Sequence, residues 1–503
     1  MPASGDDRPR NVVPRWRTFE ATMNTGELSP LTSLSTSRFN DDMVADLLHE
    51  FEQDTAFSIA ADLVSAAFTL GRFGIADEAA KHVLHARNGT DSARSIASLY
   101  LDGAPVSDAF DASPAIDTSD LSGAIRDAKR QLRVYPLNAL LWANLARSYL
   151  TIGRPKKALR AMKVALGLAP HNRHILRVAS RFYLHQQDPE RAHSLLAAAP
   201  QVKTDPWLLS AEIATASATD RKSTLVKTAK RVLESNRFPA FHTSELASAV
   251  GTVEAKSGSM RVARQFIRAS IESPTENACA QAGWMSVNAD GFAGVAQIPE
   301  KSPEANAWIA KESGEWTRSM SETKVWMRDQ PFSSRPAILG SYLASTVFED
   351  YESGAKFAKV GLVSNPEDEV LLNNLAFALA QLGQVEDAQT AISKVNQEDL
   401  NETSKVINMA THGLIAFRAG DPAAGAQNYL DAIHLARRNQ LPQEFQAAIY
   451  LALEQIRAGI GDIELVRATA LDAVKRIDSP LGKVLQDKLK NAAPLPIAGI
   501  ATS

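Results

Sequence analysis

Few residues of this chain have the types and spacing that catalysis needs. Glu78, His82 and His85 stand at i, i+4 and i+7, so one helical face could present three metal ligands. Such a triplet is more often surface decoration, and no glycine-rich phosphate loop and no Ser, His and Asp set stands out. The sequence therefore predicts a protein that is not an enzyme and that binds no cofactor and no metal.

Basic residues form the second chemically capable group. Residues 121–270 contain 25 Lys and Arg against 9 Asp and Glu, a balance of +16, whereas the whole chain carries −3, so the remainder carries −19. This segment could bind an anionic ligand or pair with the acidic flanks. A basic outer ridge is expected, which could contact nucleic-acid phosphates without reading sequence. Its residues are Arg126, Lys129, Arg130, Arg133, Arg154, Lys156, Lys157, Arg160 and Lys163.

The elements that must position these side chains are clearest over 139–172. Large and small apolar residues recur there at i, i+3, i+4 and i+7, which predicts a helix. Gly153 permits a turn, and a second helix carries Ala158 and ends at Pro170. Ala146 and Ala158 are expected where the two helices cross closely. The combined pattern of large, small, turn and proline residues resembles the tetratricopeptide repeat (TPR), a helix–turn–helix unit of 34 residues.

The resemblance implies an all-α, TPR-like α-solenoid, a right-handed superhelix of helix hairpins, in two arrays with a helical connector. We expect an extended or disordered arm, N-terminal helices with a degenerate repeat, a basic array, a Trp-rich helical connector, a C-terminal array with its cap, and a flexible tail. The arm is expected over 1–40, the N-terminal helices over 41–100 and the basic array over 121–277. The connector is expected over 278–334, the C-terminal array with its cap over 335–491 and the tail over 492–503. The connector contains Trp284, Trp308, Trp316 and Trp326, which are expected to pack within it rather than to form a ligand pocket.

In the TPR family the concave face binds peptides or protein segments, and its positions can be carried over to this chain. They are Asn144, Arg147, His174, Arg177, Arg181, Asn373 and Asn374. The first five resemble a carboxylate clamp that holds an acidic peptide end, although Ala143 and Arg147 replace the usual lysine and asparagine. These arginines could equally be a solvated helix face. Asn373 and Asn374 suit a neutral or extended segment, because an amide can pair with a peptide backbone.

The arm over 1–40 contains a basic and aromatic cluster of Arg15, Trp16, Arg17 and Phe19. It is expected to be an inert tail, and the alternative is docking on a partner or on the protein's own surface. The chain has one cysteine, Cys279, and no apolar run long enough for a membrane span, so a cytoplasmic protein is expected.

Together these patterns predict a non-catalytic scaffold or adaptor that recruits a protein of a multicomponent system. The expected partner is a protein or peptide, for which the clamp-like positions suit an acidic one, and nucleic acid could bind through 121–270. The alternative is a regulatory sensor that responds to a peptide or nucleic acid and switches a partner effector.

Overall fold

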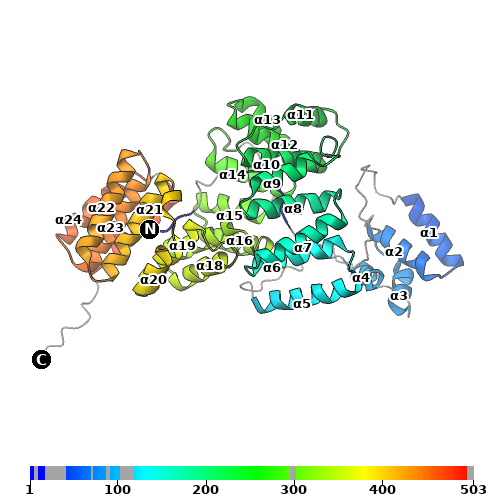
Figure 1. The fold of residues 1–503 in the computed structure, drawn as a ribbon, viewed down its shortest axis with the longest axis horizontal. Coiled ribbons are helices and arrows are strands. Elements are labelled where there is room, and N and C mark those ends of the chain that lie inside the picture. The colour runs from blue at the N-terminus through cyan, green and yellow to red at the C-terminus, as the bar shows by residue number, and fades with distance from the viewer. Residues whose placement is uncertain are drawn as a thin grey trace.

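The computed structural model describes residues 1–4, 10–16, 41–69, 72–86, 91–101, 118–294, 302–477 and 479–494. In this part of the chain 25 α-helices and one 3-10 helix form, and there is no strand. The predicted all-α solenoid is therefore confirmed (Figure 1). None of the described helices has both the length and the apolar character that crossing a bilayer requires.

The first four helices form a group with its own core, at one end of the molecule (Figure 1). Leu63, Val64, Val83 and Tyr100 lie in that core and are almost completely buried. The fourth helix was not expected from the sequence. The bounds are α1 Asp41–Gln53, α2 Phe57–Thr69, α3 Asp77–His85 and α4 Asp91–Leu101.

The next nine helices stack as hairpins, as the spacing of the sequence predicts. Asn138 caps α6 through its side chain, Gly153 makes the turn at φ +66°, and Pro155 begins α7. Ala146 and Ala158 are both fully buried where these two helices meet. The bounds are α5 Thr118–Val134, α6 Ala139–Thr151, α7 Pro155–Leu168, α8 Arg173–His185, α9 Pro189–Ala197, α10 Pro206–Ala218, α11 Val226–Glu234, α12 Ala240–Lys256 and α13 Met260–Ser270.

The tryptophan-rich region continues the stack. Its helices α14 Glu276–Asn288, α15 Pro303–Glu312 and α16 Trp316–Asp329 each pack on the next, and α16 packs on α17. Trp308 and Trp326 are buried against each other, with ring centroids 6.3 Å apart. These rings therefore serve packing.

The remaining helices complete the solenoid and cap its end. Asp350, Asp368 and Asp421 cap α18, α19 and α22 through their carboxylates. The bounds are α17 Ser334–Thr346, α18 Tyr351–Ser364, α19 Glu369–Gln381, α20 Val385–Ile392, the 3-10 helix Gln397–Asp399, α21 Glu402–Arg418, α22 Pro422–Arg438, α23 Gln443–Ala458, α24 Ile463–Val474 and α25 Pro480–Asn491.

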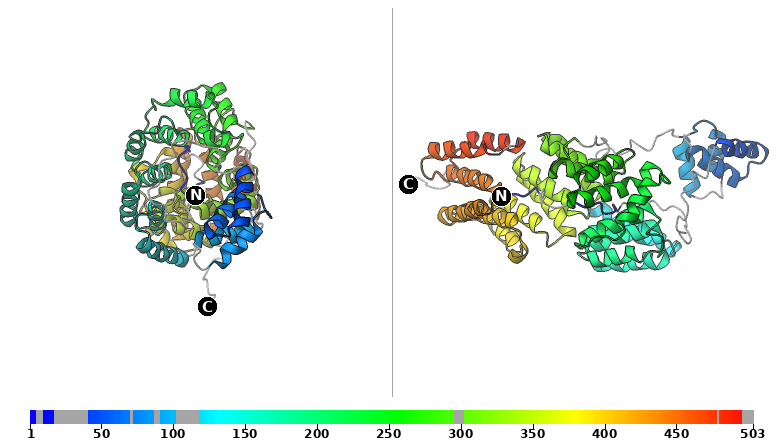
Figure 2. Two further views of the ribbon diagram at one scale, coloured as in Figure 1. Left: turned by 90° about the vertical axis from the view of Figure 1, so that its right-hand side faces the viewer. Right: turned by 90° about the horizontal axis from the view of Figure 1, so that it is seen from above.

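The superhelix curls until two distant hairpins touch. Ser364 Oγ, at the end of α18, donates a hydrogen bond to the Thr151 carbonyl at the end of α6. Within the second of these hairpins, Asn365 Nδ2 after α18 donates to the Phe332 carbonyl before α17 at 3.0 Å. Viewed along its length, the stack surrounds the N-terminus of the chain (Figure 2, left). We call the residues that face this central space the inner face.

Candidate functional site: the inner face of the solenoid

The inner face holds residues 1–4 and 10–16, which we call the N-terminal segment. This segment forms no helix and runs from α21 and α19 to α8 and α6 (Figures 1 and 2). Met1, Ala3, Val12 and Trp16 are buried, and each belongs to a different core cluster of the solenoid. The segment is therefore anchored at four separate places. The sequence favoured an inert tail here, but the described part of the segment docks on the protein's own surface, which was the alternative. Arg17 and Phe19 of the predicted cluster lie outside the described residues.

Two neighbouring asparagines of α19 bind the main chain of the segment. Asn374 Oδ1 accepts a hydrogen bond from the Ala3 amide at 2.7 Å, and Asn374 Nδ2 donates to the Ala3 carbonyl at 2.8 Å. Asn373 Nδ2 donates to the Met1 carbonyl at 2.8 Å. Asn374 also donates to Ser341 Oγ on α17, which fixes the orientation of its amide. Both asparagines are almost completely buried.

Three further side chains bind main-chain carbonyls of the segment. Gln281 Nε2 donates to Arg10 at 3.0 Å, and Asn277 Nδ2 donates to Val13 at 2.8 Å. At the far end, Arg147 Nε donates to Trp16 at 2.9 Å. Thr411 on α21 also contacts the Met1 amine at 2.7 Å and the Met1 carbonyl at 3.3 Å. Because six side chains on four helices contact backbone atoms, this surface is built to hold an extended chain.

Arg10 enters a pocket of fixed acceptors. Its Nε donates to Glu304 Oε1 at 2.8 Å, one Nη to Gln281 Oε1 at 2.9 Å and the other to Asn277 Oδ1 at 2.8 Å. Arg10 is 7% exposed and Glu304 5%. The planar guanidinium is thus bound on three sides by acceptors from α14 and α15.

Arg15 contacts the other oxygen of the same carboxylate. Its Nη2 lies 2.6 Å from Glu304 Oε2, while Nη1 contacts Asp329 at 2.5 Å and Glu276 at 3.2 Å. Burial alone would raise the pKa of Glu304, but Arg10, Arg15 and the more distant Arg335 lower it to about 2. Glu304 is therefore a charged anchor shared by both arginines of the segment.

Trp16 fills an aromatic pocket between α8 and the chain before α17. Its ring centroid lies 6.2 Å from that of Phe182 and 5.5 Å from that of Phe332. The guanidinium groups of Arg147 and Arg181 lie 5.9 and 5.1 Å from the Phe332 ring. Aromatic and cation–π contacts of this kind add to the burial of the indole.

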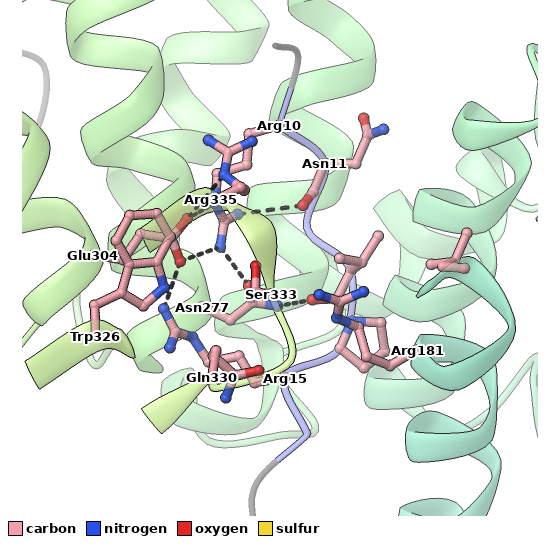
Figure 3. Close-up of a pocket in the computed structure, with 13 residues that line it drawn as sticks. Arg10, Asn11, Arg15, Arg181, Asn277, Glu304, Trp326, Gln330, Ser333 and Arg335 are labelled. Carbon is pink, nitrogen blue, oxygen red and sulfur yellow. Dashed lines mark hydrogen bonds and ion pairs between the residues drawn. The ribbon is translucent and has the colours of Figure 1, made fainter. Parts of the chain in front are cut away.

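A hollow of about 230 Å³ remains between the segment and the wall. Figure 3 shows Arg10, Arg15 and Arg335 grouped around Glu304, with Arg181 reaching in from α8 on the opposite side. Burial, and then the neighbouring arginines, lower the pKa of Arg181 to about 10, although Glu304 opposes the shift. The centre of the inner face is therefore dense in both signs of charge.

The structure places the residues predicted from the sequence in two groups. Arg147, Asn373 and Asn374 bind the main chain of the segment, and Arg181 lies beside its aromatic pocket. Asn144 on α6 and His174 on α8 are half-buried; Arg177 pairs with Glu245 at 2.6 Å and stacks 4.7 Å from Trp207. Burial, and then the charge of Arg177, lower the pKa of His174 to about 4.

The charge of the bound segment differs from the expectation. The family resemblance implied an acidic peptide held by arginines, but the segment is basic and its arginines meet Glu276, Glu304 and Asp329. Sequence reasoning missed these acids, together with Asn277 and Gln281. The i, i+4 spacing of Asn277 and Gln281 was the available signal, since it places two amides on one helical face.

The histidine triplet makes other contacts. Glu78 Oε1 is paired with Lys81 at 2.7 Å, and His85 Nδ1 lies 2.7 Å from the Lys81 carbonyl. Over the ranges that the structure describes, no three His, Cys, Asp or Glu side chains group as metal ligands.

Comparison with known proteins supports the repeat assignment. Residues 153–218 match the family model described as tetratricopeptide repeat. No match to this chain was found among curated proteins.

Several solved structures are similar over most of their length. The human IFIT1 dimer with PPP-AAAA is 14% identical, with 90% of this chain and 96% of that chain covered and a TM-score of 0.32. Yeast Tom70 is 12% identical, with 90% and 96% covered and a TM-score of 0.29. The APC/C hetero-tetramer Cut9-Hcn1 is 12% identical, with 92% and 98% covered and a TM-score of 0.33.

Proposed function

We propose, because this chain carries tetratricopeptide repeats, that it is a non-catalytic scaffold or adaptor whose inner face binds an extended segment of a partner protein. Binding there would bring the partner to other members of a multicomponent system. The observation that carries the proposal is the set of side chains that bind the main chain of residues 1–4 and 10–16, which includes Asn277, Gln281, Arg147, Asn373 and Asn374. Because every protein chain presents the same backbone groups, an extended segment of another protein can make these contacts equally well.

The geometry also favours a protein ligand over a small molecule. Contacts to the segment extend from Thr411 on α21 to Arg147 on α6, across both arrays. A site of that length suits a chain of many residues. Small-molecule sites are instead compact and enclosed.

Cross-linking of captured partners tests the proposal. The full chain is used as bait, and lysine-reactive cross-links to each partner are mapped by mass spectrometry. We expect cross-links at Lys256, whose Nζ lies 3.2 Å from Asn11 at the edge of the inner face. Cross-links confined to outer lysines such as Lys129 and Lys163 would reject inner-face binding.

A second candidate function, nucleic-acid binding in a regulatory sensor, rests on the outer ridge of α5 and α7. All nine basic residues that the sequence singled out there are exposed. Among the described residues only Arg130 of these nine forms an ion pair, with Asp127 at 3.4 Å. The amines of Lys129 and Lys157 lie 5.9 and 5.8 Å from the ring of the buried Tyr149, so both cations pack over the same aromatic side chain.

Salt dependence separates the two candidates. Binding of a fluorescent single-stranded oligonucleotide by charge should weaken steeply between 50 and 200 mM salt, by about tenfold or more for several phosphate contacts. Substituting Lys129, Arg133, Lys157 and Arg160 by Ala should abolish it and leave protein capture unchanged. Retention by the quadruple variant would reject the ridge as a nucleic-acid site.

A further inference from the structure

The proposed function, on which this inference rests, does not specify the chemistry of the partner's segment. We infer that the inner face is specific for an extended segment with two arginines five residues apart and a tryptophan directly after the second, and that residues 10–16 occupy this site in competition with the partner. The N-terminal segment is then both the template for the ligand and a built-in competitor.

The first arginine is selected by the geometry of its acceptors. Glu304, Gln281 and Asn277 approach three different nitrogens of Arg10. A lysine ammonium, a point charge on a flexible stem, cannot reach three acceptors arranged around a plane. Lysine at this position would therefore leave a buried acceptor without a donor, which costs free energy.

The spacing of the two arginines is fixed by one carboxylate. Arg10 contacts Glu304 Oε1 at 2.8 Å and Oε2 at 3.3 Å, and Arg15 contacts Oε2 at 2.6 Å, so one buried carboxylate binds both arginines. Between them the main chain is held by Asn277 at Val13, and the Val12 side chain is buried beside Leu209 and Leu246. Adding or removing one residue between the arginines would displace one of them from Glu304.

The charge of the site requires a cationic occupant. If Arg10 and Arg15 left the site, the ion pair that the structure describes for Glu304 would be the long one with Arg335, at 3.9 Å. A carboxylate buried to this degree is costly unless a cation and hydrogen bonds compensate it. An acidic segment would add repulsion from Glu276 and Asp329, which lie around Arg15. The site therefore discriminates against acidic ligands.

The tryptophan supplies the apolar anchor. Trp16 is fully buried among Phe182 and Phe332, and Arg147 binds its carbonyl. An aromatic side chain that fills a preformed pocket beside a fixed hydrogen bond is a typical hot spot of a binding interface. A smaller residue would leave this pocket unfilled.

Covalent attachment gives the built-in segment an advantage. Residues 17–40 connect it to α1, and a tethered ligand commonly experiences an effective concentration on the order of 1 mM. A partner segment of equal intrinsic affinity at micromolar concentration would therefore displace little of it. We expect a productive partner to bind additional surface, or to bind after the N-terminal segment has been released.

The test uses the full chain with a protease site introduced between residues 17 and 40, cleaved after the protein has folded. The probe is a fluorescein-labelled synthetic peptide of residues 1–16, and binding is followed by anisotropy after the released piece has been removed by dialysis. We expect the cleaved protein to bind the peptide at least about tenfold more tightly than the uncleaved protein does. Peptides with Arg10→Ala and Arg15→Ala, or with both arginines changed to Lys, should bind at least about tenfold more weakly.

Each outcome has a distinct meaning. Equal binding to cleaved and uncleaved protein would overturn competition, and equal binding of the Arg→Ala peptide would overturn the specificity. Binding of no peptide at all would contradict the proposed function itself. Where the released piece resists dialysis, the full chain with Arg10→Ala and Arg15→Ala serves instead, provided its circular dichroism matches that of the unchanged protein. Exchange of the segment between two copies, seen as a dimer by light scattering, would overturn the intramolecular assignment.

Discussion

The Asn374 side chain pairs with both the amide and the carbonyl of Ala3, at 2.7 and 2.8 Å. This reciprocal pair is the arrangement by which one strand residue recognises another, but here a helix presents it to a non-helical chain. Asn374 is fully buried, so its amide has no alternative partner in water. The pair therefore couples the placement of residues 1–4 to the packing of α17 and α19.

Replacing this amide should release the start of the chain. In Asn374→Ala the Ala3 amide and carbonyl lose their partners, and each buried polar group left unsatisfied costs about 1–3 kcal/mol. We expect the backbone amides of Ala3 and Ser4 to exchange with deuterium at least about tenfold faster, while α19 stays protected. The control is Asn439→Ala, since Asn439 is exposed and binds Glu402 and the Leu435 carbonyl instead. Unchanged exchange at Ala3 would contradict the assigned contact.

Trp16→Ala should detach a segment without unfolding the solenoid. Truncating a buried tryptophan typically costs about 3–5 kcal/mol, but here the loss cannot exceed the free energy with which the segment is docked. We therefore expect fast exchange over 10–16 and a modest fall in Tm. Phe182→Ala is the comparison, because Phe182 belongs to α8 and its loss should lower the Tm of the whole array. Equal Tm losses in the two variants would show that the segment is an integral part of the core.

The double variant Arg147→Ala with Arg177→Ala illustrates how the structure changes an expectation. From the sequence these are solvent-facing groove residues, and their removal should leave melting intact. In the structure Arg177 pairs with the buried Glu245, and Arg147 binds the carbonyls of Trp16 and Asp329. Breaking one partner of a buried ion pair costs about 3–5 kcal/mol, so thermal denaturation should show a clearly lower Tm. An unchanged Tm would mean that these contacts contribute little.

The hairpins could be predicted because their signals are local. Asn138, Gly153 and Pro155 mark the start, the turn and the restart within one repeat, and the structure uses each for that purpose. Ala146 and Ala158 likewise identify the helix crossing through their size alone. Such contacts lie within about one repeat of each other, so their spacing in the sequence specifies them.

The occupied inner face could not be predicted because its contacts are distant. Arg10 meets Glu304 only after many hairpins have been stacked, and the curvature that brings them together is a sum of small rotations. The composition around Trp16 indicated that docking was one option, but not on which surface. Glu304 follows Pro303 at the start of a helix, where a carboxylate is expected for helix stability alone.

Stability should decline as the pH falls through the range where histidine protonates. Burial, and then the charge of a nearby arginine, lower the pKa of His174 to about 4 and that of His185 to about 3. In the unfolded chain these histidines take up protons near pH 6.5. The stabilisation that they contribute is therefore fully present above that pH, and it is lost as the pH falls toward their pKa values in the folded protein. The full loss is about 3 kcal/mol for His174. Urea unfolding between pH 7 and 5 should show roughly 2 kcal/mol of this loss, and the rest should appear below pH 5. His174→Gln should reduce the slope while the exposed His171→Gln should not.

The contact between distant hairpins can be tested at a single glycine. Gly153 has φ +66°, and a Cβ there would lie 2.4 Å from the Val363 carbonyl oxygen on α18. Gly383 has φ +75° and open space around the same position, so Gly383→Ala carries the backbone strain, about 1–2 kcal/mol, without the collision.

Gly153→Ala should therefore destabilise the protein more than Gly383→Ala does, and it alone should change the solenoid. The added Cβ would clash with a carbonyl oxygen of the α18 backbone, which cannot move aside as a side chain can. The two hairpins must therefore separate, and the Ser364–Thr151 hydrogen bond must lengthen. Small-angle scattering should then give a larger radius of gyration for Gly153→Ala only. The inner face would widen with it, so residues 10–16 should also exchange faster. Identical scattering from the two variants would show that the inner face keeps its shape without this contact.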